Sequence, residues 1–126
     1  MRDVKEKNTG PSVNIWKGIK KDIELGIITG AYETGNRFPS ISQVAEMYGI
    51  GSTTAQKVLD MLCSENIIYK RQGVGYFLKP FVKDRLLVFH MKQLYGMYAE
   101  TAKYSKQLGV GLDKACRILT DMWNNE

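Results

Sequence analysis

The sequence predicts a mainly α-helical protein with a small β-hairpin, and three observations lead to this fold class. Apolar residues recur at helical spacing in five stretches, at about 15–28, 41–48, 52–65, 84–108 and 112–123. Two short β-prone runs, 67–71 and 76–78, flank a glycine-containing turn. The chain has 126 residues, which is enough for one domain with a short appendage and too few for a large two-domain enzyme.

Isoleucine recurs every fourth residue in the first predicted helix, 15–28. This spacing places one apolar stripe on the face that should meet the core, and polar side chains such as Glu24 on the opposite face. The predicted stripe consists of Ile15, Ile19, Ile23 and Ile27.

Two short helices joined by a tight turn should follow. Ser40 and Gln43 have the spacing of a capping box, in which the serine hydroxyl accepts from a first-turn N–H and the glutamine reaches back. The helix that they begin, 41–48, ends at a glycine-containing break, 49–51, and the next helix is 52–65. Two helices joined in this way form a helix-turn-helix. The residues that the second helix should bury are Ala55, Val58, Leu59 and Leu62.

The β-prone runs 67–71 and 76–78 should pair as a hairpin around the turn 72–75. A hairpin directly after the second helix of a helix-turn-helix is a wing. The predicted fold is therefore a winged helix-turn-helix domain followed by a two-helix tail.

The tail carries more apolar residues than one small domain can cover. Leu87, Met91, Leu94 and Tyr98 step by four, three and four residues along the helix 84–108, which is the spacing of a coiled-coil seam. We expect this seam to pair two copies of the chain. Packing of the tail against its own domain is the alternative. The predicted dimerisation residues are Leu87, Met91, Leu94, Tyr98 and Leu119.

Composition and charge place the chain among ordinary globular proteins. Hydrophobic residues make up 44% and charged residues 25%. No apolar run reaches the roughly 18 residues of a membrane-spanning helix, and residues 1–12 lack the apolar core of a secretory signal. We therefore expect a cytoplasmic protein with no membrane association.

The net charge of +5 permits a polyanionic partner but does not localise it. Residues 1–80 carry 11 basic and 8 acidic side chains, and residues 81–126 carry 7 and 5, so the positive excess is spread along the chain. The argument that the protein binds nucleic acid therefore depends on the order of the predicted helices and strands rather than on net charge.

Metal chemistry is not expected. Cys63 and Cys116 are far apart and lie in no Cys-x-x-Cys motif. With one histidine, His90, they cannot complete a structural zinc site. Both cysteines are expected as free thiols in a reducing cytoplasm.

The predicted recognition surface follows from the geometry of duplex DNA. An α-helix fits the major groove, and its first two turns present side chains to base edges. Glycine at the wing tip lets the backbone approach a sugar–phosphate ridge or enter the minor groove. Alternatively, the hydroxyls only cap the helix, the longer side chains are solvated, and the glycines serve an ordinary tight turn. The side chains in the first two turns are Ser52, Thr53, Thr54, Gln56 and Lys57.

Residues 14–78 resemble the DNA-binding domain of the GntR family of bacterial transcription regulators. The resemblance rests on the stretches IWKGIKKDIELGIITGAYETGNRFPS, ISQVAEMYGIGSTTAQKVLDML and ENIIYKRQGVGYFL. It implies that Thr53, Thr54 and the wing-tip Gly73 contact DNA, and it extends this role to Arg71 and Gln72 beside them. The family residues present are Gly30, Gly35, Pro39, Ser40, Ala45, Tyr48, Gly49, Thr53, Thr54, Leu59, Gln72, Gly73 and Gly75.

The chain departs from the family at three positions. Arginines that contact the operator in many relatives are replaced here by Ser42, Ser52 and Gln56. The protein should therefore recognise a different base sequence from that of the arginine-bearing relatives. The contribution of phosphate contacts to affinity should also be smaller, unless Lys57, Lys70 and Arg71 replace the missing arginines. The complete predicted DNA-binding set is Ser42, Ser52, Thr53, Thr54, Gln56, Lys57, Arg71, Gln72 and Gly73.

The short tail is similar to that of the YtrA subfamily, in which the tail dimerises and no separate sensor domain is present. The resemblance implies a homodimeric repressor on a two-fold symmetric double-stranded DNA operator, with half-sites about one helical turn apart. The corresponding division is a flexible N-terminal arm over 1–12, a DNA-binding domain over 13–79 and a dimerisation tail over 80–126.

A protein-interaction module that kept the winged fold but lost operator reading is the second hypothesis, because the three arginines are missing. An enzyme is not supported, since there is no Ser/His/Asp arrangement and no Gly-x-x-x-x-Gly-Lys-[Ser/Thr] phosphate loop. No cofactor is expected. Whether a small-molecule effector exists is left open, and such a ligand would have to bind a small cleft between domain and tail.

Overall fold

The structure is a computed structural model that describes the backbone of residues 11–125 and the side chains of residues 15–125. It comprises two compact units, which divide between Leu87 and Val88. Residues 1–10 of the predicted N-terminal arm lie outside the described residues. The division of the chain after residues 12 and 79 stays a prediction.

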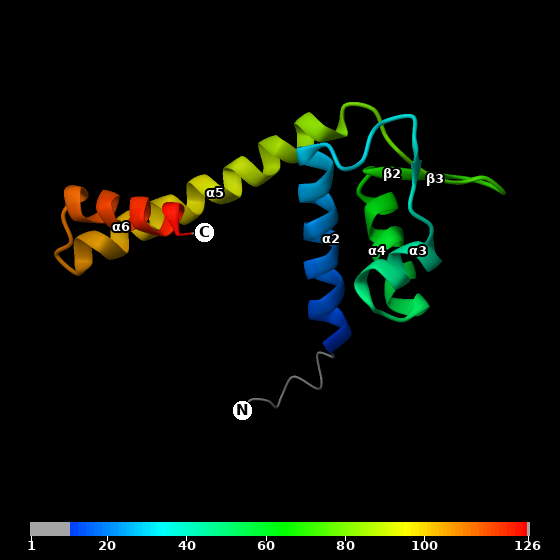
Figure 1. The fold of residues 1–126 in the computed structure, drawn as a ribbon. Coiled ribbons are helices and arrows are strands. Elements are labelled where there is room, and N and C mark those ends of the chain that lie inside the picture. Colours follow the sequence, from blue (N-terminus) through cyan, green and yellow to red (C-terminus); the bar gives the residue numbers. More distant parts are fainter. Residues whose placement is uncertain (1–10, 126) are drawn as a thin grey trace. The chain divides into compact units, whose positions relative to one another are not determined.

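Every predicted helix and both strands of the predicted hairpin are present in the predicted order, which confirms the mainly helical class (Figure 1). Helix α5 (Val82–Gln107) starts in the first unit and continues into the second, which ends with α6 (Leu112–Asn124). The other elements belong to the first unit and form a winged helix-turn-helix. They are α2 (Pro11–Thr29), β1 (Arg37–Phe38), α3 (Ile41–Tyr48), α4 (Ser52–Ser64), β2 (Ile68–Arg71) and β3 (Gly75–Leu78).

The sheet contains a strand that the sequence does not predict. Strands β2 and β3 form the predicted hairpin, in which Arg71 lies opposite Gly75. Strand β1 pairs with the other edge of β3, in the order β1-β3-β2, and Arg37 lies opposite Phe77. A strand of two residues shows no alternation in the sequence, and only its pairing with β3 defines it.

One apolar core joins the helices and the sheet of the first unit. In α2 the predicted stripe is buried at Ile19, Ile23 and Ile27, whereas Ile15 is 44% exposed. Ile15 lies one turn closer to the start of the helix, beyond the core. The predicted buried stripe of α4 is confirmed in full, with 0% exposure at Ala55, Val58, Leu59 and Leu62.

Glu24 is buried, with 4% exposure, although its spacing predicted a solvated side chain. Lys20 explains this difference, because its Nζ lies 2.7 Å from Glu24 Oε2 and 2.8 Å from Oε1 of Glu65, the C-cap of α4. Burial alone would lower the pKa of Lys20, but the two carboxylates outweigh it and raise the pKa above the usual 10.5. The paired charges hold α2 against the C-terminal end of α4.

Local chemistry sets the two ends of α3. Ser40 Oγ accepts the Gln43 N–H at 3.2 Å, and Gln43 Oε1 accepts the Ser40 N–H at 2.9 Å, which confirms the capping box. Gly49 ends the helix in the left-handed conformation, with φ at 62°. Glycine adopts this conformation without the strain that a Cβ would cause.

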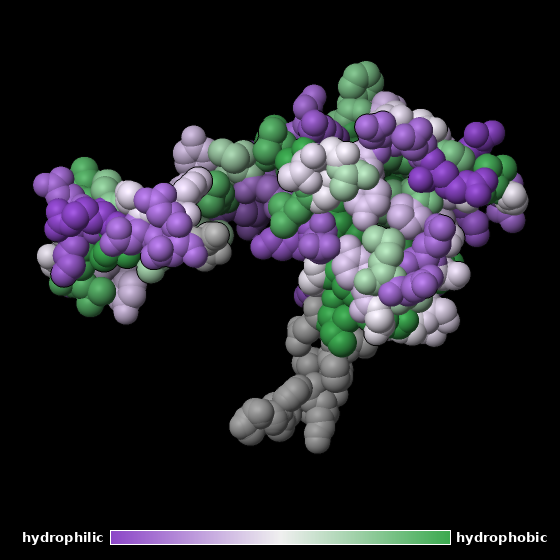
Figure 2. All heavy atoms as spheres, in the orientation of Figure 1, coloured by the Kyte–Doolittle hydropathy of each residue, from purple (hydrophilic) through white to green (hydrophobic). Residues whose placement is uncertain are grey.

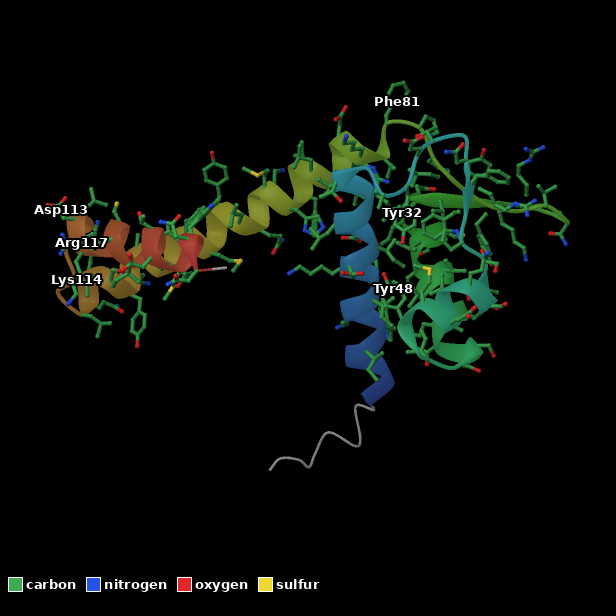
Figure 3. All side chains as sticks on the ribbon, in the orientation of Figure 1. Tyr32, Tyr48, Phe81, Asp113, Lys114 and Arg117 are labelled. Atoms are coloured by element: carbon green, nitrogen blue, oxygen red, sulfur yellow. The ribbon has the colours of Figure 1, made fainter. Side chains whose placement is uncertain are left out.

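A hydrogen bond joins α3 to α2. Tyr48 Oη donates to Asp22 Oδ2 at 2.6 Å, and Tyr48 is labelled in Figure 3 together with Tyr32. Burial and the hydrogen bond to Asp22 raise the pKa of Tyr48, and burial raises that of Tyr32. Both phenols are therefore held in their neutral form, and the bond fixes α3 on α2.

We expect the protein to lose stability in alkaline solution. The pKa values of Lys20, Tyr32, Tyr48 and Tyr76 are all raised in the folded chain, from ordinary values of 10.5 for lysine and 10.0 for tyrosine. A group with a raised pKa holds its proton more tightly when folded, so its contribution is complete below the unfolded pKa and is lost as pH rises through the folded one. The unfolding free energy from urea denaturation should stay level to about pH 9 and fall above about pH 10. The variant Tyr48→Phe should show a shallower fall, and a level curve up to about pH 11 for the natural protein would contradict the prediction.

The start of α5 is tied to the end of α4. Arg85 Nη2 donates to the carbonyl oxygens of Glu65 and Asn66, at 3.2 and 2.9 Å. Just before α5, Phe81 has a left-handed backbone with φ at 63°, a strained conformation for this residue type. Its ring is 84% exposed and points away from the ribbon (Figure 3).

The second unit exposes its apolar residues. None of residues 88–125 is buried, and Figure 2 shows hydrophobic side chains on the surface of this unit. After Gly109, whose φ is 75°, α6 turns back along α5 (Figure 1). Leu94 is 37% exposed and Trp123 is 71% exposed. A helix pair with so little burial has no core of its own in a single chain.

Candidate nucleic-acid interface

The leading end of α4 is open to solvent. Gly51 is its N-cap, in an extended conformation and without a side-chain cap hydrogen bond. Ser52 and Thr53 are exposed, and Thr54 is half-buried. Since a glycine caps the helix through its backbone, the hydroxyls of the first turn are not used as caps. This counts against the alternative that Ser52 and Thr53 serve only to cap the helix.

The second turn of α4 carries two longer polar side chains that are already engaged. Gln56 Nε2 donates to Asp60 Oδ1 at 3.0 Å, one turn further along the same helix. Lys57 Nζ lies 5.3 Å from the centre of the Trp16 ring, in a cation–π arrangement with α2. Both side chains are exposed. To form a bidentate pair with an adenine, through the oxygen and the NH₂ group of its amide, Gln56 must first break its hydrogen bond to Asp60.

The wing projects from the helical body as the β2–β3 hairpin (Figure 1). The turn is closed by a hydrogen bond from the Val74 N–H to the Arg71 carbonyl oxygen at 2.9 Å. Gly73 has a φ of 75°, which explains a glycine at the tip. The exposed residues Arg71, Gln72 and Gly73 form one continuous stretch there.

The predicted DNA-binding residues come from three segments of one compact unit. Ser42 is exposed in the first turn of α3, five residues lie in the first two turns of α4, and the remainder lie at the wing. The helix-turn-helix and the wing thus belong to one folded body. The role of each of these residues in binding stays a prediction.

Sequence reasoning missed one cation beside the wing. Arg37 is exposed on β1, and its side chain packs against Gly75 of β3. In the sequence, the only indication of this cation was the arginine itself, two residues before Pro39. The strand β1 is too short to be recognised from the sequence pattern. The pairing of β1 with β3 is what brings Arg37 to the hairpin.

The predicted dimerisation residues lie exposed in the single chain. Leu87, Met91, Leu94 and Tyr98 are between 37% and 46% exposed along α5, and Leu119 of α6 is 46% exposed. Side chains of this kind are normally covered in the working form of a protein. Their pairing across two copies stays a prediction.

The part of the chain that the structure describes contains no group of three or more His, Cys, Asp or Glu residues able to hold a metal ion. Cys63 and Cys116 are free, and burial raises the pKa of the Cys63 thiol. No helix within residues 11–125 is long and apolar enough to cross a membrane.

Solved structures share this architecture. A GntR family transcriptional regulator from Listeria monocytogenes is 27% identical, with a TM-score of 0.71 over 85% of this chain and 93% of that chain. A transcriptional regulator from Oenococcus oeni is 16% identical, with a TM-score of 0.71 over 86% and 90% of the two chains. A protein assigned to the GntR family from Bacteroides thetaiotaomicron is 20% identical, with a TM-score of 0.66 over 87% and 97%. At these identities the last two show the fold alone.

A family match covers the winged unit. The bacterial regulatory proteins of the gntR family match residues 16–78, which is half of the 126-residue chain. No curated protein matches the chain significantly. The chain therefore belongs to the GntR family, and it is a winged-helix DNA-binding transcription regulator.

Proposed function

We propose that the protein is a homodimeric repressor that binds a two-fold symmetric DNA operator. The observation that carries the proposal is the open leading end of α4. The hydroxyl groups there make no capping hydrogen bond, and they belong to the same folded unit as the projecting wing. The leading end of such a helix is the part that enters the major groove in helix-turn-helix proteins.

Each part of this surface has a distinct task. Thr53 and Thr54 bond phosphates or base edges, and their methyl groups contact thymine. Gly73 lets the wing tip approach the minor groove, and Arg71 bonds an adjacent phosphate. The proposed set is completed by Ser42, Ser52, Gln56, Lys57 and Gln72.

The tail pairs two copies through its exposed seam. None of residues 88–125 is buried in a single chain, and Leu87, Met91, Leu94 and Tyr98 recur at coiled-coil spacing. Because these side chains are only 37–46% exposed in the single chain, covering each of them contributes less than half of the roughly 1.5–3 kcal/mol that full burial of a large apolar side chain gives. We assign residues 80–126 to dimerisation, residues 13–79 to DNA binding, and the chain to the YtrA-like subfamily on this pattern.

A dimer of this kind represses by occupying DNA that polymerase needs. The site of action is the cytoplasm, where the bacterial chromosome lies. Catalysis has no part in this function, and no cofactor is required. An inducing ligand, where one exists, acts by changing the affinity of the dimer for its operator.

Selection of bound sequences from a random DNA pool tests the proposal. The bound pool should converge on a palindrome whose half-sites are about one helical turn apart. Fluorescence anisotropy at physiological salt should then show tighter binding to the selected duplex than to random duplex.

A second candidate function is a protein-interaction module without operator reading. It is favoured by the serines and glutamine at the three family arginine positions and by the hydrogen bond that holds Gln56 to Asp60. A pool that shows no enrichment, together with capture of a protein partner by the winged unit, would support this candidate and overturn the repressor.

A further inference from the structure

One face of the three-stranded sheet gathers two arginines and two aromatic rings. Opposite residues of paired strands share a face, as do residues two apart on one strand. Arg37 and Tyr69 both lie opposite Phe77, and Arg71 lies opposite Gly75. We call these five residues, Arg37, Tyr69, Arg71, Gly75 and Phe77, the outer sheet face.

Each of the two arginine side chains extends diagonally over the outer sheet face, away from the residue directly opposite it. The guanidinium carbon of Arg71 lies 5.4 Å from the centre of the Phe77 ring, and that ring stacks on Tyr69 with centroids 5.8 Å apart. Arg37 leans the other way, so that a Cβ on Gly75 would lie 3.5 Å from Arg37 Nε and 3.6 Å from its Cδ. Packing on a ring and beside a glycine restricts both side chains before any ligand arrives.

The two arginines on this face have no carboxylate partner among the side chains that the structure describes. Among residues 15–125, no carboxylate lies within 4.0 Å of either guanidinium. Both arginines are exposed, and Tyr69 is 38% exposed. The opposite face of the same sheet is buried at Phe38 and Tyr76. Two like charges on one exposed face of a sheet make the potential over that face positive, which favours an anion there.

We propose that the outer sheet face binds the phosphodiester backbone of the DNA duplex, with Arg37 as a phosphate-contacting residue on β1. This inference rests on the proposed function and adds a contact to it. The planar guanidinium matches two phosphate oxygens, and the face continues directly into the wing tip at Gln72 and Gly73. The arginines of the outer sheet face supply positive charge that α3 and α4 lack, because those helices carry Ser42, Ser52 and Gln56 in place of the family arginines.

The duplex fits this face better than an acidic protein does. The face belongs to the hairpin that the proposed function already brings against the sugar–phosphate ridge, so its arginines reach the duplex without a second docking event. A protein partner that bound here would compete with DNA for the wing.

The test compares Arg37→Gln with the natural protein in the full chain. Anisotropy is measured with the selected operator and with a random-sequence duplex of about three helical turns, over a salt series. The dimer carries two copies of Arg37, so loss of one phosphate contact in each subunit should reduce the slope of log affinity against log salt by about 1.8, which corresponds to roughly sixtyfold weaker binding at about 0.1 M salt. The loss should be equal for both duplexes, because backbone contacts carry no sequence information. Arg37→Lys should keep the slope.

A matched control removes one charge elsewhere in the same unit. Lys83 lies in the first turn of α5, which Arg85 ties to the C-terminal end of α4, away from the leading end. Lys83→Gln should leave the affinity and the slope unchanged. Thermal unfolding of Arg37→Gln should match that of the natural protein, because the substituted side chain is exposed.

Two results would overturn this inference and leave the proposed repressor function intact. The first is an Arg37→Gln variant with natural affinity and slope on an operator that the natural protein selects. The second is a loss confined to the operator, which would make Arg37 a base-reading residue. Failure of the natural protein to select any sequence would instead overturn the proposed function.

Discussion

Replacing Leu94 and Tyr98 by glutamate should convert the protein to a monomer and lower its operator affinity by about two to four orders of magnitude. Both side chains lie on the α5 seam, with 37% and 46% exposure in the single chain. In a paired seam each glutamate would be a desolvated carboxylate facing its own symmetry copy. The monomer would lose the effective concentration that the first half-site confers on the second.

Light scattering during size-exclusion chromatography would measure the mass, and anisotropy would measure binding to a full operator and to a single half-site. Half-site affinity should be unchanged, because the winged unit has its own core. The control variant carries Gln93→Glu and Ala99→Glu, which add equal charge at exposed positions of α5 outside the seam. A Leu94→Glu/Tyr98→Glu protein that stays dimeric at every concentration would refute the assignment of the seam.

The double substitution Thr54→Ala with Gly73→Asp should weaken operator binding by roughly a hundredfold without changing dimerisation. Thr54 is a half-buried side chain at the leading end of α4, and its loss removes one hydroxyl contact. At position 73 a carboxylate would meet the phosphates of the minor-groove edges, and like charges repel. Aspartate tolerates the left-handed backbone better than most residues, and nothing lies within 4 Å of a Cβ there, so the hairpin should persist.

Gly73→Asn is the matched control for the wing, because asparagine has nearly the same shape and no charge. It should bind DNA far more tightly than Gly73→Asp. Operator binding is measured by anisotropy, and the dimer is checked by light scattering. Natural affinity in the double variant would show that the DNA-binding surface lies elsewhere on the molecule.

Most of the winged fold could be predicted because its signals are local. The capping box of Ser40 and Gln43, the left-handed Gly49 and the four buried residues of α4 each follow from a few neighbouring side chains. The family frame along residues 14–78 depends on the same positions, and these residues are enough to indicate the GntR family. The DNA-binding set rests on that frame and on helix geometry, and it remains to be tested.

Other features depended on contacts between distant parts of the chain. Strand β1 exists only as a partner of β3, and its pairing is what carries Arg37 onto the face of Arg71. Glu24 has the spacing of a solvated residue but is buried, because Lys20 and the end of α4 enclose it.

The sequence by itself determined the ends of α3, the core stripe of α4, the wing and the family, since caps, periodicity and turns are encoded by residues close together in the chain. The tertiary structure alone decided which charges are buried, which cations share a surface, and that none of residues 88–125 is buried in a single copy. The physical reason is that burial and charge pairing depend on what packs against a residue, and the packing partners are supplied by the rest of the fold.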